Sequence, residues 1–414
     1  MELPTPKRDQ LLQHLLAALA FAIPWAKKAI PTLIGVIVVF ALIRFFKRKS
    51  ASIPSQPTAL FGLFALFMLL VLGTTYTQHP NEAWNEIGIK LSFLIFPLLA
   101  LITPSLEKAD LKNILNAFVA GCFLFMAITI SHAVWVIAQH PDWYYFTYDR
   151  LSWYIHPTYA ATYQAMALFA LLHAGIKRNF LAGNMWLHLL AITLLLVFIA
   201  LLSSKAGYLC ALLVLAYAAY YALRNGMRLS SIAMAATLTI ALFITMILAL
   251  PTTSDRVKDA VADIRTSETA VESSDTVATA HTSSTSMRFI TWSASWKLLC
   301  ENPFGTGTGD TQPELNRLYR QQGEDYAALR QFNAHNQFLQ TGAEIGWIGL
   351  VALLVVLIAL WSIGRNEPTV RIFVLLCALN FLFESFLEVQ AGIVFCSFWT
   401  MVYSRMKDCR IIGL

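Results

Sequence analysis

Apolar residues recur along the chain in long runs, which are separated by short polar or charged segments. A helix needs about 20 consecutive apolar residues to cross the hydrocarbon core of a bilayer. The pattern therefore predicts an all-α, polytopic membrane protein with about 12 transmembrane helices. We expect these helices at residues 9–25, 29–46, 58–75, 84–103, 111–138, 157–176, 185–203, 206–223, 229–250, 337–361, 369–387 and 390–404.

The first run is the weakest, because it contains Gln13 and His14 and has a small-x-small pattern at residues 18–20. That pattern resembles a signal-peptidase site, so a cleaved signal sequence is the alternative interpretation. We favour a retained helix, because a second apolar run follows within a few residues and the segment Pro24–Pro31 fits a tight hairpin turn.

The composition agrees with a membrane protein, since 57% of the 414 residues are hydrophobic and 13% are charged. Soluble domains carry about 25% charged residues, so a soluble enzyme, a disordered scaffold and a coiled coil are excluded. The six cysteines show no C-x-x-C or Cys/His metal spacing, and Cys300 alone lies in a long polar loop. We therefore expect no disulfide within the chain at that loop.

Lysine and arginine residues are concentrated in every second loop, and such asymmetry predicts the orientation in the membrane. One set of loops holds 17 of them: Lys7, Arg8, Arg44, Lys47, Arg48, Lys49, Lys108, Lys112, Lys177, Arg178, Arg224, Arg228, Arg365, Arg371, Arg405, Lys407 and Arg410. The other set, without the one long loop, holds 5: Lys27, Lys28, Lys90, Arg150 and Lys205. The positive-inside rule places the richer set and both termini in the cytoplasm.

This orientation divides the chain into three parts. Residues 1–250 form helices one to nine, residues 251–336 form a long periplasmic loop, and residues 337–414 form helices ten to twelve with a short cytoplasmic tail. The loop is the part in which the chemistry is expected.

The long loop has two halves of different composition. Residues 252–286 contain 15 serines and threonines among 35 residues, too few apolar side chains for a packed core. Within this half, Ser254–Ile264 could form a short amphipathic helix. Residues 287–336 contain recurring aromatic residues among arginines and glycines, which predicts a folded cap on the membrane surface.

The first motif of the cap is a helical face formed by Arg288, Trp292 and Trp296, which are spaced four residues apart. A guanidinium group beside aromatic rings suits an anionic, amphipathic ligand such as a phosphate-bearing lipid. From the spacing alone, however, an interfacial helix with ordinary aromatic belt residues is the better interpretation.

The second motif is the glycine-rich segment Glu301–Asp310, in which glycines alternate with other residues. Its backbone amides could hold a phosphate, although the segment is neither a P-loop nor a dinucleotide fingerprint. The third motif, Asn333–Gln340, places His335 at the water boundary of the tenth helix. A histidine there could act as a general base, although a hydrogen-bonded structural role is common for a single histidine.

Four of the charged residues within or beside the apolar runs are candidates for a role, because charge is costly there. Lys205 follows a turn on the outward side, and it could extend to the interface without a further role. Glu384 and Glu388 lie four residues apart at the outer end of the eleventh run. We interpret Glu344, on the helix face opposite His335, as a structural partner. No His or carboxylate cluster has metal-ligand spacing, so we expect a metal-independent reaction without a cofactor.

Together these motifs resemble the O-antigen ligase/polymerase family. The resemblance rests on the Arg-x-x-x-Trp helix, on Asn-Pro-x-Gly-x-Gly at 302–307, and on His-Asn-x-Phe-Leu-Gln-x-x-x-Glu-x-Gly at 335–346. The segment 383–392 also looks like this family, and the match covers about 185–400 in order. The resemblance implies a GT-C-like, all-helical glycosyltransferase of the bacterial inner membrane. It would transfer a glycan from undecaprenyl diphosphate to lipid A-core oligosaccharide at the periplasmic face.

The resemblance also implies roles for individual residues. Arg288 matches an essential loop arginine and His335 an essential histidine, while Lys205 occupies the position of a second arginine that usually holds the diphosphate. Lysine keeps the charge but loses the bidentate geometry of arginine. We expect His335 to activate the acceptor hydroxyl, with inversion at the anomeric carbon. Supporting roles are expected for Trp292, Asn302, Gly305, Gly307, Asn336, Glu384 and Glu388.

Three alternatives remain at this point. Within the family, the acceptor could instead be another repeat unit, as in a polymerase, or a protein, as in a protein O-oligosaccharyltransferase. The third alternative is a lipid or polysaccharide transporter, which predicts charged residues across the bilayer midplane. We rank the transporter lower, because the unusual polar residues gather on the outward side, and we expect no nucleic-acid partner.

Overall fold

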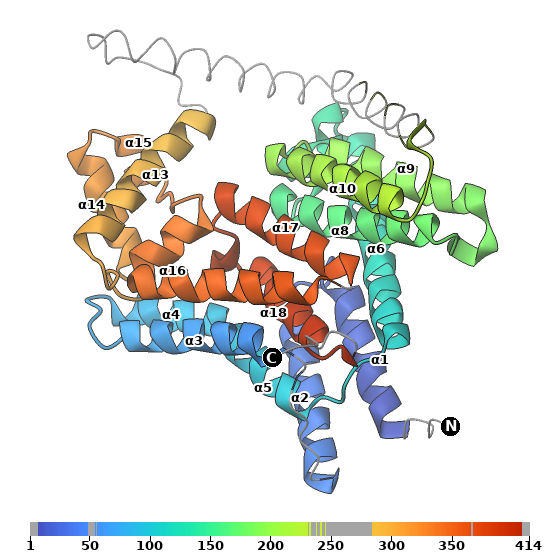
Figure 1. Ribbon diagram of the computed structural model, residues 1–414. Coiled ribbons are helices and arrows are strands. Elements are labelled where there is room, and N and C mark those ends of the chain that lie inside the picture. The colour runs from blue at the N-terminus through green and yellow to red at the C-terminus, as the bar shows by residue number, and fades with distance from the viewer. Residues whose placement is uncertain are drawn as a thin grey trace.

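Figure 1 shows the computed structural model of the chain, which describes residues 7–48, 54, 56–230, 284–365 and 367–407 and the positions 232, 237, 241 and 245. Within these residues, every predicted apolar run forms one helix or two consecutive helices. Most of the run at 229–250 and the segment Ser254–Ile264 lie outside the described residues. Apart from a bridge between Leu106 and Met406, the described part of the chain contains only helices, turns and loops.

The N-terminal part consists of six helices. They are α1 (Lys7–Ala22), α2 (Ile30–Arg48), α3 (Pro57–Gly73), α4 (Pro80–Lys90), α5 (Ser92–Ile102) and α6 (Lys108–Gln139). The run predicted at 84–103 is thus divided into α4 and α5, with Leu91 between them still in right-handed helical geometry. Helix α1 packs against α2 and α6, as expected for the first two helices of a hairpin.

The central part begins with two short turns, η1 (Trp143–Phe146) and α7 (Tyr148–Leu151). It continues with the helices α8 (Pro157–Ile176), α9 (Met185–Leu201) and α10 (Lys205–Arg224), with the short turn η2 (Leu181–Gly183) before α9. Most of the polar side chains of α8 are buried against neighbouring helices, including Thr162 and Gln164, which are fully buried. A helix buried in this way tolerates polar residues that lipid contact would exclude.

The second half of the long loop forms three helices, α13 (Ser284–Glu301), α14 (Thr311–Gln321) and α15 (Asp325–Leu329). They share a small apolar core that includes Leu298, Leu315 and Tyr319. In Figure 1 these helices lie together at one end of the group formed by α3, α4, α16 and α17. Residues 287–336, called the cap below, are therefore folded and helical, whereas their place on the membrane surface stays a prediction.

The C-terminal part contains α16 (Gln337–Ile363), α17 (Pro368–Phe383), η3 (Phe386–Glu388) and α18 (Gln390–Ser404). Helix α16 is interrupted after Glu344, where Gly346 has a φ of 71° and Ile345 departs from helical geometry. It packs along α3, and Gly62 permits the close approach, since a Cβ there would lie 2.6 Å from Val356 Cγ2. Helix α17 ends at Phe383, so Glu384, which was predicted inside the helix 369–387, lies with Glu388 in the connection to α18.

Membrane-spanning capacity can be compared with the prediction. Within the described residues, five segments are long and apolar enough to cross a membrane: Ile30–Lys47, Pro80–Ile102, Lys108–Gln139, Lys205–Arg224 and Gln337–Ile363. Shorter apolar helices accompany them, including α3, α9 and α17. The chain is an all-α protein with several membrane-span candidates, whereas the number of 12 spans stays a prediction.

Candidate active site

A cavity of about 300 Å³ lies between the cap and the helix bundle. It brings together residues that are far apart in the sequence, namely Lys205, Arg288, His335 and Glu384. Its remaining walls include Tyr148, His156, Thr158, Tyr326 and Phe332. Lys205, Arg288 and His335, which were expected to carry the chemistry, therefore share one cavity. Glu384, which was expected to support them, lines the same cavity.

Arg288 is positioned by helix α13, on the side that faces the end of α17. Its Nε donates a hydrogen bond to the carbonyl oxygen of Phe383, 3.2 Å away. One turn later, Trp292 Nε1 donates to the carbonyl oxygen of His335, at 3.3 Å. The predicted face of α13 thus joins two segments of the cavity, while Trp296 contacts Trp347 edge to face outside it.

His335 lies in the tight turn that precedes α16. Its φ of 45° is in the left-handed region, and its amide donates to Asn333 Oδ1 at 3.0 Å. Asn336 caps α16, because its Oδ1 accepts from the amide of Leu339 and its Nδ2 donates to the carbonyl oxygen of Leu382. This strained turn is held by side chains on both sides, so it fixes the direction of the imidazole.

Glu384 is the carboxylate nearest to His335, with 3.5 Å between Oε1 and Nδ1. Its side chain is 14% exposed, and that of His335 is 28% exposed. Burial alone would raise the pKa of Glu384, but contact with His335 and the charges of His335, His156 and Arg288 hold the pKa below its usual value. Glu384 is therefore ionised at neutral pH and can orient His335, as a carboxylate does beside a catalytic base.

Lys205 enters the cavity from the first turn of α10. Ser204 caps this helix by accepting from the amide of Gly207, and its hydroxyl lies 3.3 Å from that of Thr158 on α8. The preceding Ser203 has a φ of 46°, so the turn between α9 and α10 is tight. The side chain of Lys205 is half-buried, and its position at a helix start next to α8 fixes it at the same cavity as Arg288.

The glycine-rich segment, whose amides could have held a phosphate, lies outside the cavity. Asn302, Gly305 and Gly307 do not line the cavity. The amides of Thr306 and Gly307 donate to the carbonyl oxygens of Ala343 and Glu344. These amides are already used, so the loop packs against the break in α16 rather than presenting a row of amides to a phosphate. A Cβ at Gly305 would lie 2.3 Å from the carbonyl oxygen of Glu344, which explains the glycine.

The same loop ends in a polar contact that the sequence did not reveal. Asp310 accepts hydrogen bonds from the amides of Gln78 and His79 and lies 2.7 Å from His79 Nδ1. Burial acts to raise the pKa of Asp310, but the hydrogen bonds from Gln78, His79 and Thr77 lower it below its usual value. The cap is thereby tied to the connection between α3 and α4.

Next to the cavity lies a buried ionic cluster that the sequence also did not reveal. Lys90 Nζ lies 2.7 Å from Glu344 Oε2 and 2.9 Å from Glu388 Oε2, and its side chain is 3% exposed. Glu388 in turn accepts from Gln337, whose Oε1 accepts from the amide of Leu387. The prediction that placed Lys90 in an outward loop is wrong, because the residue is buried in the last turn of α4. Lys90 lies inside the predicted run at 84–103, where an unpaired charge is costly, so its position in the sequence already indicated a buried, paired side chain.

The cluster clarifies two of the predicted roles. Glu344 is a structural partner, as expected, and its partner is Lys90. Glu388 does not line the cavity, but it helps to hold the first turn of α16 against η3. His335 and Glu384 come directly before these two elements, so the cluster braces both of them.

Comparison with known proteins adds one match. Residues 189–354 match the family model described as O-antigen ligase. This range contains Lys205, Arg288 and His335, whereas Glu384 lies beyond its end. No curated protein sequence matches the chain.

Proposed function

We propose that the chain is an O-antigen ligase-like glycosyltransferase that uses a lipid-linked glycan as donor, a proposal that the family match over residues 189–354 supports. The proposed donor is a glycan on undecaprenyl diphosphate, and the proposed acceptor is the lipid A-core oligosaccharide. The reaction would take place at the periplasmic face of the inner membrane.

One observation carries the proposal: the cavity combines two cationic side chains with an imidazole–carboxylate pair. A diphosphate leaving group needs positive charge as its bond to the sugar breaks, and Arg288 and Lys205 supply two such charges. A sugar hydroxyl needs a base to accept its proton, and His335 beside Glu384 is suited to that task. The two requirements of glycosyl transfer are therefore met within one cavity.

The proposed reaction is a single displacement. The acceptor oxygen attacks the anomeric carbon of the donor while its proton passes to His335. The bond between that carbon and the diphosphate oxygen breaks, and undecaprenyl diphosphate leaves with the electron pair. Arg288 and Lys205 stabilise the negative charge that develops on the leaving group, and Glu384 stabilises the imidazolium ion. One displacement inverts the configuration at the anomeric carbon.

The size of the cavity agrees with substrates that are anchored elsewhere. A volume of about 300 Å³ is at the lower end of the range for small-molecule sites, so it accommodates the reacting groups and not a polymer. The polyprenyl chain and the glycan must extend outside, toward lipid and toward the periplasm. Tyr148, Tyr326 and Phe332 in the cavity wall provide apolar surface for sugar rings.

The acceptor is the least constrained part of the proposal, because a repeat unit or a protein hydroxyl needs the same base and the same leaving-group site. Envelope analysis of a deletion strain separates the three cases. A ligase predicts loss of polymer from lipid A-core with accumulation of lipid-linked polymer, and complementation by the native chain but not by His335→Ala.

Two other results would assign the chain differently. Core molecules that carry a single repeat unit would indicate a polymerase, and unchanged lipopolysaccharide with unglycosylated proteins would indicate a protein-directed transferase. Accumulation of the lipid-linked glycan on the cytoplasmic side alone would indicate a transporter and would contradict a transferase.

A further inference from the structure

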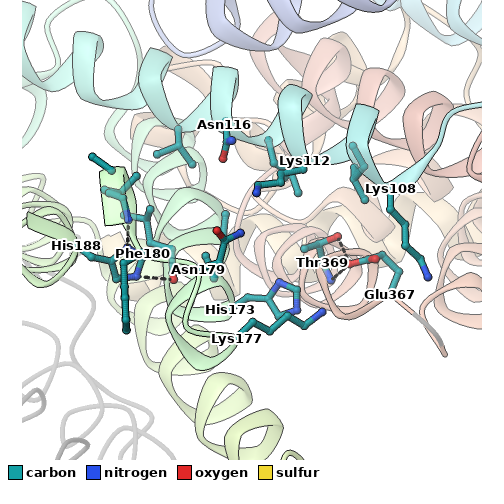
Figure 2. A pocket seen from close by; sticks show the side chains of 18 residues that line it. Lys108, Lys112, Asn116, His173, Lys177, Asn179, Phe180, His188, Glu367 and Thr369 are labelled. Atoms are coloured by element: carbon teal, nitrogen blue, oxygen red, sulfur yellow. Dashed lines mark hydrogen bonds between the residues drawn. The ribbon is translucent and has the colours of Figure 1, made fainter. Parts of the chain in front are cut away.

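A second cavity, of about 370 Å³, lies away from the candidate active site. It is formed by the start of α6, the last turns of α8, the segment that leads into α9, and the start of α17. Figure 2 shows its lining, with Lys112 and Asn116 on one side and His173, Lys177 and Asn179 on the other. None of the residues assigned to glycosyl transfer contributes to it.

The polar part of this cavity is cationic. Lys108, Lys112 and Lys177 line it from two different helices, and one carboxylate, Glu367, accompanies them. That carboxylate accepts hydrogen bonds from the amide and hydroxyl of Thr369, so it serves as the cap of α17. Three lysines against one carboxylate leave a positive local charge, which attracts an anion.

The two histidines of the cavity have structural hydrogen bonds. His188 Nε2 lies 3.0 Å from the carbonyl oxygen of Leu171, and His173 Nε2 lies 3.3 Å from the hydroxyl of Tyr221. They are therefore part of the wall, and the lysines with Asn116 and Asn179 are the groups that can contact a ligand.

The rest of the lining is apolar. Leu111, Leu115 and Val119 contribute from α6, and Leu171, Phe180 and Leu181 from the opposite side. A cavity lined by both cationic groups and aliphatic side chains fits a molecule that has both an anionic head and an alkyl chain.

The position of the cavity points to the membrane boundary opposite the active site. The active-site cavity is lined by His156 and Thr158 at the start of α8, and the second cavity by residues up to Lys177 at its end. Helix α17 also extends from one cavity to the other. Thr369 in its first turn lines the second cavity, and Glu384 directly after its last residue lines the active-site cavity. A helix of 20 residues such as α8 is about 30 Å long, which matches the hydrocarbon core of a bilayer.

We propose that this cavity binds the phosphate headgroup of an anionic glycerophospholipid from the cytoplasmic leaflet. The three lysines hold the phosphate, and the aliphatic wall holds the first part of an acyl chain. Basic pockets between transmembrane helices on the cytoplasmic side are suited to such headgroups. This inference does not depend on the identity of the glycan or of its acceptor.

Native mass spectrometry of the delipidated, full-length chain in detergent tests the proposal, with phosphatidylglycerol and phosphatidylcholine as probes. The native chain should bind phosphatidylglycerol more tightly. The double variant Lys112→Gln/Lys177→Gln should lose roughly tenfold or more in phosphatidylglycerol affinity, since two of the three positive charges that attract the headgroup are removed. Lys112→Arg/Lys177→Arg keeps both charges and should retain the affinity. The loss in the glutamine variant would then be due to the missing charge and not to a change in the fold.

The matched control is Lys47→Gln/Arg228→Gln, which removes the same charge from two exposed residues outside the cavity. It should leave phosphatidylglycerol binding unchanged. Equal losses in the two glutamine variants, or equal affinity for phosphatidylcholine, would overturn the proposal. Competition by inorganic phosphate at the same concentration as phosphatidylglycerol would show a free-phosphate site and would also overturn it.

Discussion

At the scale of single residues, the proposed proton transfer depends on the pairing of His335 with Glu384. Their side-chain atoms approach to 3.5 Å, although the residues are separated by a complete helical hairpin of α16 and α17. A histidine without an orienting group has two tautomers and several orientations available, so the carboxylate restricts it to one role.

Removal of this carboxylate should weaken catalysis without weakening donor binding. Glu384→Gln keeps the size of the side chain, and we expect turnover to fall about 10- to 100-fold with little change in donor affinity. Turnover of Glu384→Gln at the native level would mean that Glu384 does not position His335.

The lysine at position 205 leads to a second prediction at this scale. Lys205→Arg restores bidentate hydrogen bonding and should give activity equal to or above that of the native chain. Lys205→Ala removes a charge from the leaving-group site and should lower turnover about 10- to 100-fold. Arg224→Ala, at the other end of α10 and outside the cavity, is the matched control. Activity of Lys205→Ala at the native level would remove this residue from the site.

At the scale of helices, the buried charges determine how the elements that carry the site are held. Lys90 on α4 connects Glu344 before the break in α16 with Glu388 in η3. Removal of one partner of a buried ion pair leaves an uncompensated charge and costs about 3–5 kcal/mol. The cluster therefore stabilises the packing of three elements that meet beside the active site.

Lys90→Met should consequently destabilise the protein and reduce its activity. We expect a clear decrease in the thermal unfolding midpoint in detergent, because Glu344 and Glu388 both lose their partner. Lys28→Met makes the same chemical change at an exposed position and should leave the midpoint unchanged. Equal midpoints for Lys90→Met and the native chain would show that the cluster does not hold these elements.

The helices could be predicted from the sequence, but their contacts could not. Apolar runs are a local property, so α8 and α18 follow the predicted ranges closely. Lys90 has one local partner, Glu86 at 3.9 Å, but its two closest partners, Glu344 and Glu388, lie more than 250 residues away, and no local pattern reveals that they approach it. Glycine alternation at 305–309 likewise fits either a phosphate loop or a close contact with α16, and the structure shows the contact.

The candidate site, like the fold, could be predicted from the sequence only in part. Arg288, His335 and Lys205 were expected at the site from the family resemblance, because the local spacing of each residue fits a structural role equally well. The central role of Glu384 was not recognisable, since the predicted helix 369–387 concealed the turn that directs it to His335. His156 also lines the cavity, because it is the N-cap residue of α8 and the start of that helix faces the cavity.

At the scale of the whole molecule, the candidate active-site cavity and the basic cavity lie at opposite ends of α8 and α17. With the predicted orientation, the transferase site faces the periplasm and the basic cavity faces the cytoplasm. Lys90 of the poorer set is buried, and so are Arg44 and Arg405 of the richer set, so the excess of basic residues on the predicted cytoplasmic side keeps its direction.

Thiol labelling in cells can test this orientation. Cys300 in the cap is exposed, and the other cysteines of the described chain are buried, so an impermeant maleimide should label Cys300 from the periplasm. Cys300→Ser should abolish this labelling, and a reporter fused after Leu414 should read as cytoplasmic. Labelling of Cys300 only after the membrane is permeabilised would reverse the orientation.

The central claim is that one cavity separates two tasks, with Arg288 at the donor diphosphate and His335 at the acceptor hydroxyl. The most direct test measures the binding of a non-hydrolysable undecaprenyl diphosphate analogue together with turnover, for purified His335→Ala and Arg288→Ala. We predict that His335→Ala abolishes transfer and binds the analogue almost as the native chain does, whereas Arg288→Ala loses both. If His335→Ala loses analogue binding as severely as Arg288→Ala, His335 belongs to the diphosphate site and the proposed division is wrong.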